Sequence, residues 1–446
     1  MPARARRYKI TDIVVVGAGT AGLPAAIRAK EVEPEAQVAV LESRRYYASS
    51  LLMKRFFYIG FPDEEFYKAG VNAGGEPELW ETYVDRSRWL HEWLREKGIR
   101  PVGDKTWKEL QRIHIIEGSN ILKTLAKCAV EEKVEILFDH RAIRLVTQPE
   151  TKRVLGVKVQ TDSKELVFKA RKAVVLATGG FLRNKRLVRE FGPEWIDCAS
   201  LAPPGHLGDG LIMALDAGAA TKNISWAVVP TRSICVNSKQ ITHMDVVGSI
   251  AVDPRGRRFF NEACPRGLFS DLARACLERI PEKVFFLIYD DKIRQMGLSE
   301  KYEKPVEYKG GSIKELAMNA GICPEGLEKT INKYNSDLAT IGHDTMFGRG
   351  TVFWTSSTPP PKIDTPPFYA IKCTPALISC KGGIRINAKA QVLNWFNEVI
   401  PSLFSAGEVT GGLFYKGFYI GATMASSAMT FGCIAGENAV KEPISA

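Results

Sequence analysis

The 446-residue chain is 45% hydrophobic and 25% charged, which is typical of a globular protein with two or three domains. It contains no run of 18 apolar residues and no apolar segment near its basic start, which argues against a transmembrane helix and a signal peptide. The net charge of +11 would suit anionic substrates or nucleic acid, but the Lys and Arg residues are spread along the chain, which favours a solvated basic surface.

The spacing of cysteines and histidines argues against a metal centre. The nine cysteines form no C-x-x-C pair and the six histidines form no ligand cluster. We therefore expect free thiols in a reducing compartment, a cytoplasmic protein and no bound metal. The chain also lacks the motifs of nucleic-acid-binding modules, so we expect neither nucleic acid nor a membrane as a partner.

The first predicted elements form a dinucleotide-binding unit. Residues 9–16, KITDIVVV, predict a buried strand, and Gly17, Gly19 and Gly22 follow in G-x-G-x-x-G spacing before a helical stretch. A second predicted strand, QVAVLE, ends at Glu42. The glycines allow a tight turn and close approach of the backbone to a pyrophosphate at the helix N-terminus. Glu42 can accept hydrogen bonds from ribose hydroxyls.

Helices and strands alternate through the next part of the chain. Apolar residues at helical spacing predict a core helix at 79–97, and a second helix is predicted at 118–131. Four short strands follow, the last of them ELVFKA at 165–170. Residues 173–181, AVVLATGGF, predict a separate buried strand whose end is marked by Thr178 and two glycines, where a ligand could lie against the backbone.

The composition of the chain predicts an inserted domain. Short strands and isolated helices begin near residue 226, and a proline-rich exit lies at 357–368. We therefore predict a cofactor-binding domain built from residues 1–225 and 371–446, with a substrate or capping domain at 226–370.

Six separated stretches resemble one flavoprotein superfamily, that of the soluble fumarate reductases, tricarballylate dehydrogenases and 3-ketosteroid dehydrogenases. They follow the family's order and are VVVGAGTAG with Glu42, AVVLATGGF, GHLGDGLIMALDAGA, PRGRRFFNEACPRG, HDTMFGRG and LFSAGEVTGG. The resemblance implies an α/β fold, with a Rossmann-like FAD-binding domain of the glutathione reductase type and an inserted α+β capping domain. It also implies FAD, bound non-covalently because no histidine lies in the loop after Glu42.

The resemblance assigns the FAD contacts by position. Gly17, Gly19, Ala21 and Gly22 would hold the pyrophosphate, Glu42 the adenosine ribose, and Ala142 the adenine. The remaining implied contacts are Ser43, Ser49, Ser50, Thr178, Gly179, Asp209, Glu408, Met424 and Ala425. A helix that begins near Ala422 would aim its N-terminus at the flavin and stabilise the anionic reduced ring.

The resemblance also assigns a substrate pocket that differs from the fumarate reductase pattern. Arg266 matches the arginine that delivers the proton in fumarate reductases, and Tyr419 matches a C-terminal tyrosine of the tricarballylate dehydrogenase type. Val229, Thr242 and Asp245 replace three polar positions of the fumarate site, and His243 with Asp245 is a candidate replacement relay. Lys381, Lys416 and Arg385 are further candidates for binding a substrate carboxylate, with a surface charge as the alternative for each.

The sequence therefore predicts an FAD-dependent oxidoreductase that acts on a CH–CH bond next to a carboxylate or carbonyl, with fumarate a poor substrate. A 3-ketosteroid dehydrogenase-like desaturase is one alternative. A catalytically silent flavoprotein that binds partners through its basic surface is another. The expected partners are a small-molecule substrate with a carboxylate or ketone, and an electron donor or acceptor of unknown identity.

Overall fold

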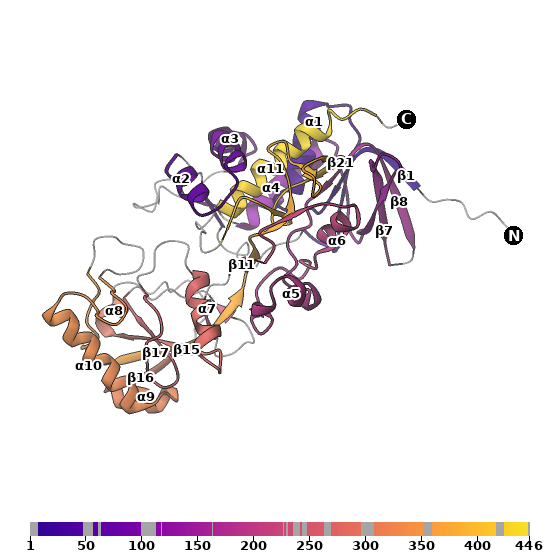
Figure 1. Cartoon of the computed structure of the whole chain (residues 1–446). Helices are drawn as coiled ribbons and strands as arrows, with labels where there is room; N and C mark the ends of the chain where they lie inside the picture. The colour runs from indigo at the N-terminus through magenta and orange to yellow at the C-terminus, as the bar shows by residue number, and fades with distance from the viewer. Residues whose placement is uncertain are drawn as a thin grey trace. The chain divides into compact units, whose positions relative to one another are not determined.

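A computed structural model describes residues 8–47, 57–60, 64–99, 113–116, 118–162, 164–225, 227–228, 231–234, 241–242, 248–262, 269–295, 307–350, 359–415 and 423–444. The chain forms two compact units (Figure 1). Unit 1 comprises Met1–Ile196, Ala202–Ala227 and Ser379–Ala446, and unit 2 comprises Asp197–Leu201 and Val228–Ile378.

Unit 1 is built on a sheet with the strand order β20-β21-β8-β1-β2-β5. The strands are β20 (Gln391–Leu393), β21 (Val399–Ser405), β8 (Glu165–Leu176), β1 (Tyr8–Val16), β2 (Val38–Leu41) and β5 (Glu135–Leu137). All neighbours from β21 to β5 run parallel, and β20 is antiparallel to β21. The apolar end of β1 is fully buried, as expected for a central parallel strand. This confirms the predicted α/β fold class.

The strand β8 corrects one prediction. The sequence indicated two strands, ELVFKA and AVVLATGGF, because charged residues separate the two apolar runs. The structure has one strand of 12 residues. Its first half pairs with β7 (Val154–Gln160), which in turn pairs with β6 (Arg141–Thr147), and there Lys169 is exposed. Its second half enters the buried centre of the sheet between β1 and β21.

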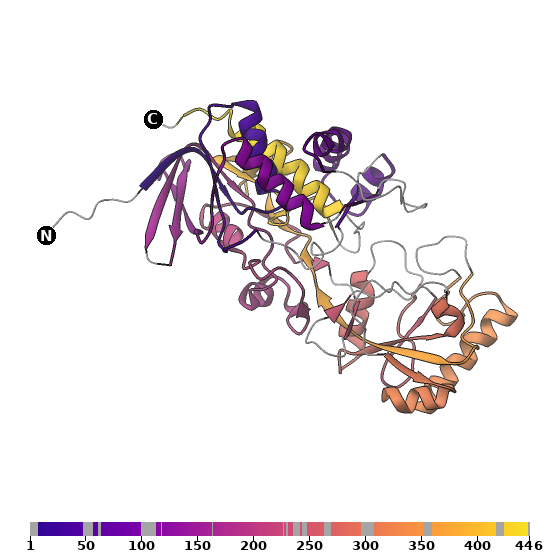
Figure 2. The same ribbon diagram turned by 180° about the vertical axis from the view of Figure 1, so that it is seen from behind.

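Three helices lie side by side over one face of this sheet (Figures 1 and 2). They are α1 (Gly22–Val32), α4 (Gly118–Glu131) and α11 (Thr423–Ala439), and α1 packs against both of the others. The helix α3 (Pro77–Glu96) packs on α11, where the Tyr83 hydroxyl donates to the Thr423 carbonyl at 3.0 Å. These contacts fix the start of α11. The predicted helices at 79–97 and 118–131 are confirmed to within two residues.

Smaller elements complete unit 1. They are β3 (Phe57–Gly60), α2 (Glu64–Asn72), β4 (Ile113–Ile116), α5 (Lys185–Phe191), the 3-10 helix η2 (Pro193–Trp195), α6 (Asp209–Asp216), β10 (Thr221–Lys222), β18 (Ser379–Cys380), β19 (Gly383–Arg385) and β22 (Thr410–Gly411). The strand β11 (Ala227–Val228) marks the point where the chain passes into unit 2.

Unit 2 is a largely antiparallel sheet with helices. Its strands are β9 (Ala199–Ser200), β12 (Thr231–Ile234), β13 (Ile241–Thr242), β14 (Ile250–Val252), β15 (Phe285–Asp290), β16 (Glu307–Gly310) and β17 (Phe368–Leu377). Its helices are α7 (Phe269–Arg279), α8 (Asp291–Gln295), α9 (Ile313–Ala320) and α10 (Pro324–Thr340). They enclose an apolar core of their own, so unit 2 has the content of a separate domain.

A buried ionic network lies inside unit 2. The Arg258 side chain is 1% exposed and makes paired hydrogen bonds to the Glu262 carboxylate at 2.9 and 2.5 Å. Its remaining nitrogen lies 2.7 Å from the Asp344 carboxylate. A second buried arginine, Arg349, lies 3.5 Å from the Glu262 carboxylate, so two arginines balance the two carboxylates of the network.

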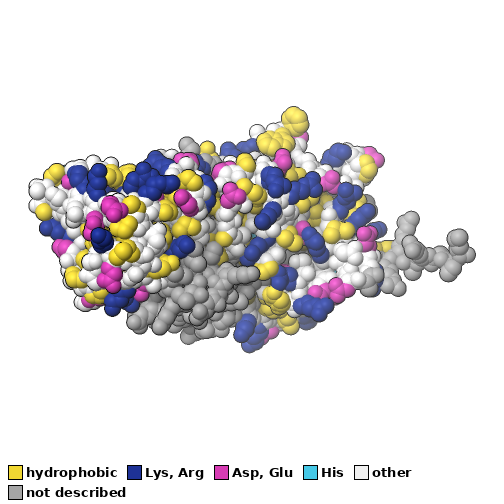
Figure 3. Space-filling view, turned by 90° about the horizontal axis from the view of Figure 1, so that it is seen from below, with side chains coloured by type: hydrophobic (Ala, Val, Ile, Leu, Met, Phe, Trp, Pro, Cys, Tyr) yellow, Lys and Arg dark blue, Asp and Glu magenta, His cyan; other side chains and the backbone are white. Residues whose placement is uncertain are grey.

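The described surface carries both signs of charge (Figure 3), and the described cysteines form no disulfide bonds. Figure 3 shows Lys and Arg side chains interspersed with Asp and Glu on the described atoms of one face, without a single basic block. The seven described cysteines are free thiols. No helix among the described residues is long and apolar enough to cross a membrane, and the same residues contain no group of three or more metal-ligating side chains.

Candidate functional site

The glycine-rich turn joins β1 to α1 at the carboxyl edge of the parallel sheet. Gly17 has a φ of +108°, and a Cβ added there would lie 2.3 Å from the Ala177 carbonyl oxygen. A Cβ on Gly22 would lie 1.8 Å from the Gly17 carbonyl oxygen, so the first and last glycines are required by the turn itself. A Cβ on Gly19 would meet nothing within 4 Å. Its open side leaves space in which a ligand can approach the backbone.

The N-terminus of α1 is suited to bind an anion. Ala21 occupies the N-cap position and makes no side-chain capping bond, and the first turn contains no acidic residue. The first N–H groups of a helix have no partner within the helix, and the helix dipole makes this end positive. An uncapped helix start after a glycine turn therefore fits the pyrophosphate of a dinucleotide.

Glu42 lies directly beside this turn, just after β2. It is 4% exposed, and its carboxylate accepts hydrogen bonds from the Ala18 N–H at 3.1 Å and the Arg44 N–H at 3.0 Å. Burial raises the pKa of the Glu42 carboxyl, and the two backbone hydrogen bonds oppose that shift. These bonds hold the carboxylate in place with lone pairs left for ribose hydroxyls. The neighbouring Ser43 also donates to Glu42, at 3.3 Å.

A second part of the candidate site follows β8. The Thr178 hydroxyl is buried and has no hydrogen-bond partner among the described residues. Gly210 packs against it, since a Cβ there would lie 2.3 Å from the Thr178 Oγ1. Buried hydroxyls are rarely left unpaired, so Thr178 is suited to meet a polar atom of a bound cofactor. The α1 N-terminus, Glu42 and Thr178 are features that suit a dinucleotide such as the FAD that the resemblance implies.

An ion pair between Asp209 and Arg141, the residue before Ala142, connects the segments that carry Asp209 and Ala142. Asp209 is the first residue of α6, and both of its carboxylate oxygens accept hydrogen bonds from Arg141 at 2.7 Å. Arg141 directly precedes Ala142 on β6. The predicted contact of Asp209 with the cofactor would therefore have to share this carboxylate with Arg141. The contacts of Asp209 and Ala142 with FAD stay predictions.

A polar cluster joins four separate segments of unit 1, which contribute Gly180, His206, Cys380 and Glu408. Glu408 accepts the Cys380 backbone N–H at 2.9 Å and lies 3.5 Å from the His206 Nδ1. The Gly180 N–H donates to the same Nδ1 at 3.3 Å, which places the proton of a neutral His206 ring on Nε2. Burial raises the pKa of the Cys380 thiol well above its usual value, so this cysteine is not a reactive thiolate. The sequence did not single out His206 or Cys380.

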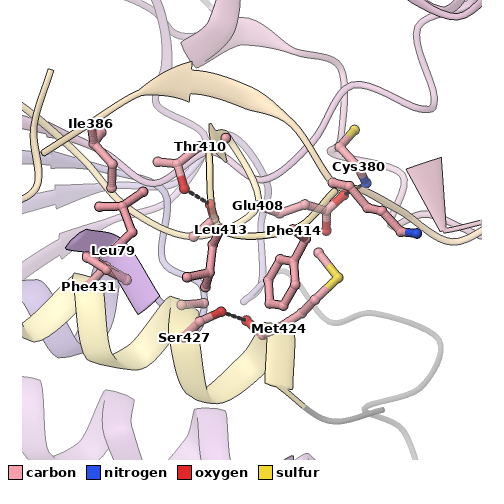
Figure 4. Close-up of a pocket in the computed structure, with 14 residues that line it drawn as sticks. Leu79, Cys380, Ile386, Glu408, Thr410, Leu413, Phe414, Met424, Ser427 and Phe431 are labelled. Atoms are coloured by element: carbon pink, nitrogen blue, oxygen red, sulfur yellow. Dashed lines mark hydrogen bonds between the residues drawn. The ribbon is translucent and has the colours of Figure 1, made fainter. Parts of the chain in front are cut away.

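A cavity lies beside Glu408, between the loop that follows β21 and the first turns of α11 (Figure 4). In Figure 4, Phe414 from the loop extends toward Met424 at the start of α11. The described lining residues are Leu79, Cys380, Lys381, Ile386, Gly407, Glu408, Thr410, Gly411, Leu413, Phe414, Met424, Ser427, Ala428 and Phe431. The Met424 sulfur lies 3.2 Å from the Ser379 hydroxyl. The predicted contacts Glu408 and Met424 thus line one cavity, and Ala425 follows Met424 on α11.

The predicted carboxylate-binding residues have different surroundings in the structure. Lys381 is 1% exposed and lines the cavity, which a sequence reading could not distinguish from a surface charge. Arg385 instead lies 3.4 Å from Glu76 and donates to the Asn397 side chain. Lys416 lies outside the described residues.

Other predicted site residues also lie outside the described part of the chain. They are Ser49, Ser50, His243, Arg266 and Tyr419, together with Val229 and Asp245 of the altered pocket. Their roles stay predictions.

Comparison with known proteins defines the family. The FAD binding domain family matches residues 12–423. A fumarate reductase (cytochrome) of Shewanella frigidimarina is 30% identical over 460 residues, covering 97% of this chain and 78% of that protein. A 4-oxocyclohexanecarboxylate 2-dehydrogenase of Sinomonas cyclohexanicum is 27% identical, covering 92% of this chain and 79% of that protein.

Structural comparison finds the same fold. The structure of a 3-ketosteroid-delta4-(5alpha)-dehydrogenase from Rhodococcus jostii superposes with a TM-score of 0.75 at 24% identity, over 99% of both chains. The glycine turn, Glu42 and the parallel sheet thus occur in a chain that matches the family along almost its whole length. The protein belongs to the FAD binding domain family, as the resemblance in its sequence indicated.

Proposed function

We propose that the protein is an FAD-dependent oxidoreductase that makes or reduces a C=C bond next to a carboxylate or carbonyl group, with FAD bound non-covalently. The observation that carries the proposal is the nucleotide-binding corner. It combines an uncapped α1 N-terminus, the fixed Glu42 carboxylate and the unpaired Thr178 hydroxyl. The names of the two sequence relatives support the substrate class, because each names a substrate that contains a carboxylate, a ketone or both.

The proposed chemistry divides between the cofactor and the chain. Bound FAD supplies the hydride acceptor or donor. The chain must hold the activating oxygen of the substrate and move a proton at the adjacent carbon. We assign the first task to Arg266, whose planar guanidinium can hold a carboxylate or an enolate-like oxygen with two parallel hydrogen bonds.

Proton transfer is assigned by the resemblance in the sequence. Arg266 is the first candidate donor, in line with the fumarate reductase pattern. Tyr419 is the second, because a phenol can donate to a carbonyl or pass on a proton. His243 with Asp245 is the candidate link to solvent.

We further propose that fumarate is a poor substrate. Three polar positions of the fumarate site are Val229, Thr242 and Asp245 in this chain. A dianion would lose several charge-assisted hydrogen bonds there, each worth about 1.5–3 kcal/mol. A larger or more apolar substrate with one carboxylate or ketone fits the aromatic residues Trp226, Phe418 and Tyr419 better.

The test begins with the purified protein. It is expected to be yellow and to release intact FAD on denaturation, and a colourless protein that takes up no FAD would contradict the proposal. A flavin that stays on the denatured chain would contradict non-covalent binding.

The FAD-loaded protein is then reduced anaerobically and mixed with a panel of enoates and enones, with fumarate included. In a parallel experiment the oxidised protein is mixed with 3-ketosteroids and with the saturated counterparts of the panel. We expect rapid flavin reoxidation by at least one enoate or enone and slow reoxidation by fumarate. Bleaching of the oxidised flavin by 3-ketosteroids alone would favour the desaturase alternative, because a desaturase transfers hydride from its substrate to the flavin. A lack of response to the whole panel, together with no bleaching of the oxidised flavin by the saturated counterparts, would favour a catalytically silent flavoprotein.

A further inference from the structure

Lys381 is a buried cation in the wall of the cavity beside Glu408. Its side chain belongs to a residue that is 1% exposed, and it is among the largest fully buried side chains of the described chain. Lysine is almost never fully buried unless its charge is compensated, because taking an ammonium group out of water is costly. Because Lys381 lines the cavity, its charge can also act on a group that the cavity binds.

The backbone around Lys381 is held on both sides. It directly follows β18, and two residues later the chain forms β19, which pairs in parallel with β22 through Ile384 and Thr410. The Cys380 N–H on its other side donates to Glu408. Lys381 thus belongs to a fixed part of the cavity wall, and its ammonium group is attached to a framework that the fold itself determines.

The charges around the cavity favour an anion. Among the described lining residues, Lys381 is the only cation and Glu408 is the only carboxylate. Glu408 already accepts the Cys380 N–H and lies beside His206. The first turn of α11, which contributes Met424 to the same wall, contains no acidic residue, so the positive end of its dipole is not neutralised there by its own side chains.

We propose that Lys381 sets the reduction potential of the bound flavin, by placing its ammonium group within electrostatic reach of the ring and stabilising the negative charge that the ring gains on reduction. This inference rests on the proposed binding of FAD. We infer that the charge of Lys381 acts on the flavin and not on the substrate, because every described residue that lines the cavity belongs to unit 1. Unit 1 also carries the nucleotide-binding corner. The proposed substrate residues Arg266 and His243 fall within the predicted capping domain at 226–370.

The experiment compares Lys381→Met, which removes the charge at similar volume, with Lys381→Arg, which retains it. The matched control is Lys389→Met, because Lys389 is an exposed lysine eight residues further along the same segment. Two properties are measured on the FAD-loaded proteins. One is the midpoint potential against reference dyes, and the other is the affinity for sulfite, which adds to oxidised flavins and leaves negative charge on the ring.

We expect Lys381→Met to reduce the preference for reduced over oxidised FAD at least tenfold, which is about 30 mV for a two-electron couple. Sulfite binding should weaken by a similar factor. Lys381→Arg should stay close to the wild-type protein, and Lys389→Met should leave both values unchanged. If Lys381→Met does not fold with FAD, Lys381→Gln provides the same comparison.

An unchanged potential and sulfite affinity in Lys381→Met would overturn the inference, and so would an equal shift in Lys389→Met. A loss of affinity for carboxylate ligands at an unchanged potential would assign Lys381 to the substrate instead. These outcomes are separate from failure of the proposed function. A flavoprotein without substrate turnover still has a measurable potential, whereas a wild-type protein without FAD would overturn both.

Discussion

The contact between α1 and α11 connects helix packing to cofactor binding. A Cβ added to Gly432 on α11 would lie 2.3 Å from the Ala21 carbonyl oxygen and 3.0 Å from the Ala21 Cα. Ordinary van der Waals contact begins near 3.4 Å, so Gly432→Ala requires the two helices to separate by about 1 Å. Ala21 is the N-cap of α1, directly at the proposed pyrophosphate site. The substitution should therefore move the part of α1 that would meet FAD.

The expected loss of stability in Gly432→Ala is the difference between a free-energy cost of overpacking and a free-energy gain in helix propensity. Overpacking costs about 1–3 kcal/mol, and replacing a helical glycine by alanine returns up to about 1 kcal/mol, so the apoprotein should lose about 0–2 kcal/mol of stability. Partial loss of one charge-assisted hydrogen bond to a phosphate should raise the Kd of FAD about tenfold, which is about 1.4 kcal/mol.

The matched control is Gly436→Ala, one turn further along α11. A Cβ there would lie 2.0 Å from the Ala25 carbonyl oxygen, so the clash is similar but falls inside α1, away from its N-terminus. Thermal unfolding of the apoproteins and titration with FAD measure the two effects. We expect similar losses of stability in both variants and weaker FAD binding mainly in Gly432→Ala. Equal weakening in both, or wild-type affinity in Gly432→Ala, would refute the reasoning.

Three further predictions concern charged residues. Because burial raises the pKa of the Glu42 carboxyl, its ionised form destabilises the apoprotein, so the wild type should gain stability relative to Glu42→Gln as the pH falls from 7 through that raised pKa. Thermal unfolding against pH checks this, and a constant difference would contradict it. Arg258→Met should cost about 3–5 kcal/mol in denaturant unfolding because it removes the cation that Glu262 and Asp344 share, and leaves only Arg349, 3.5 Å from Glu262, as a described cation of the network. Arg266→Gln and Arg266→Lys should each slow flavin reduction or reoxidation by substrate about 10²–10³-fold at unchanged FAD content, and near-normal rates would move the catalytic role to Tyr419.

The nucleotide-binding corner could be predicted because its determinants are local. Gly17, Gly22 and Glu42 lie within one strand–helix–strand unit, and their spacing reflects a turn that the chain must make. The sequence predicts the two halves of β8 as separate strands because Arg171 and Lys172 stand between the two apolar runs. Only the pairing with β7 on one side and β21 on the other shows that one strand can be half exposed and half buried.

Features that depend on distant parts of the chain could not be predicted. His206, Cys380 and Glu408 come from three separate segments, and no spacing in the sequence relates them. The burial of Lys381 has the same origin, since a lysine after a short strand is usually solvated. The sequence does not distinguish Gly432 from other small residues in a helix, because its contact with Ala21 is visible only in the structure.

The central claim is tested most directly by a single-turnover product analysis. The FAD-loaded protein is reduced under anaerobic conditions and mixed with the enoate or enone that reoxidises it fastest, and the products are quantified by mass spectrometry. We predict one saturated product, heavier than the substrate by two hydrogens, for each FAD that is reoxidised. A protein that binds FAD, yet yields no saturated product from any enoate or enone and no unsaturated product from their saturated counterparts, would contradict the proposed function.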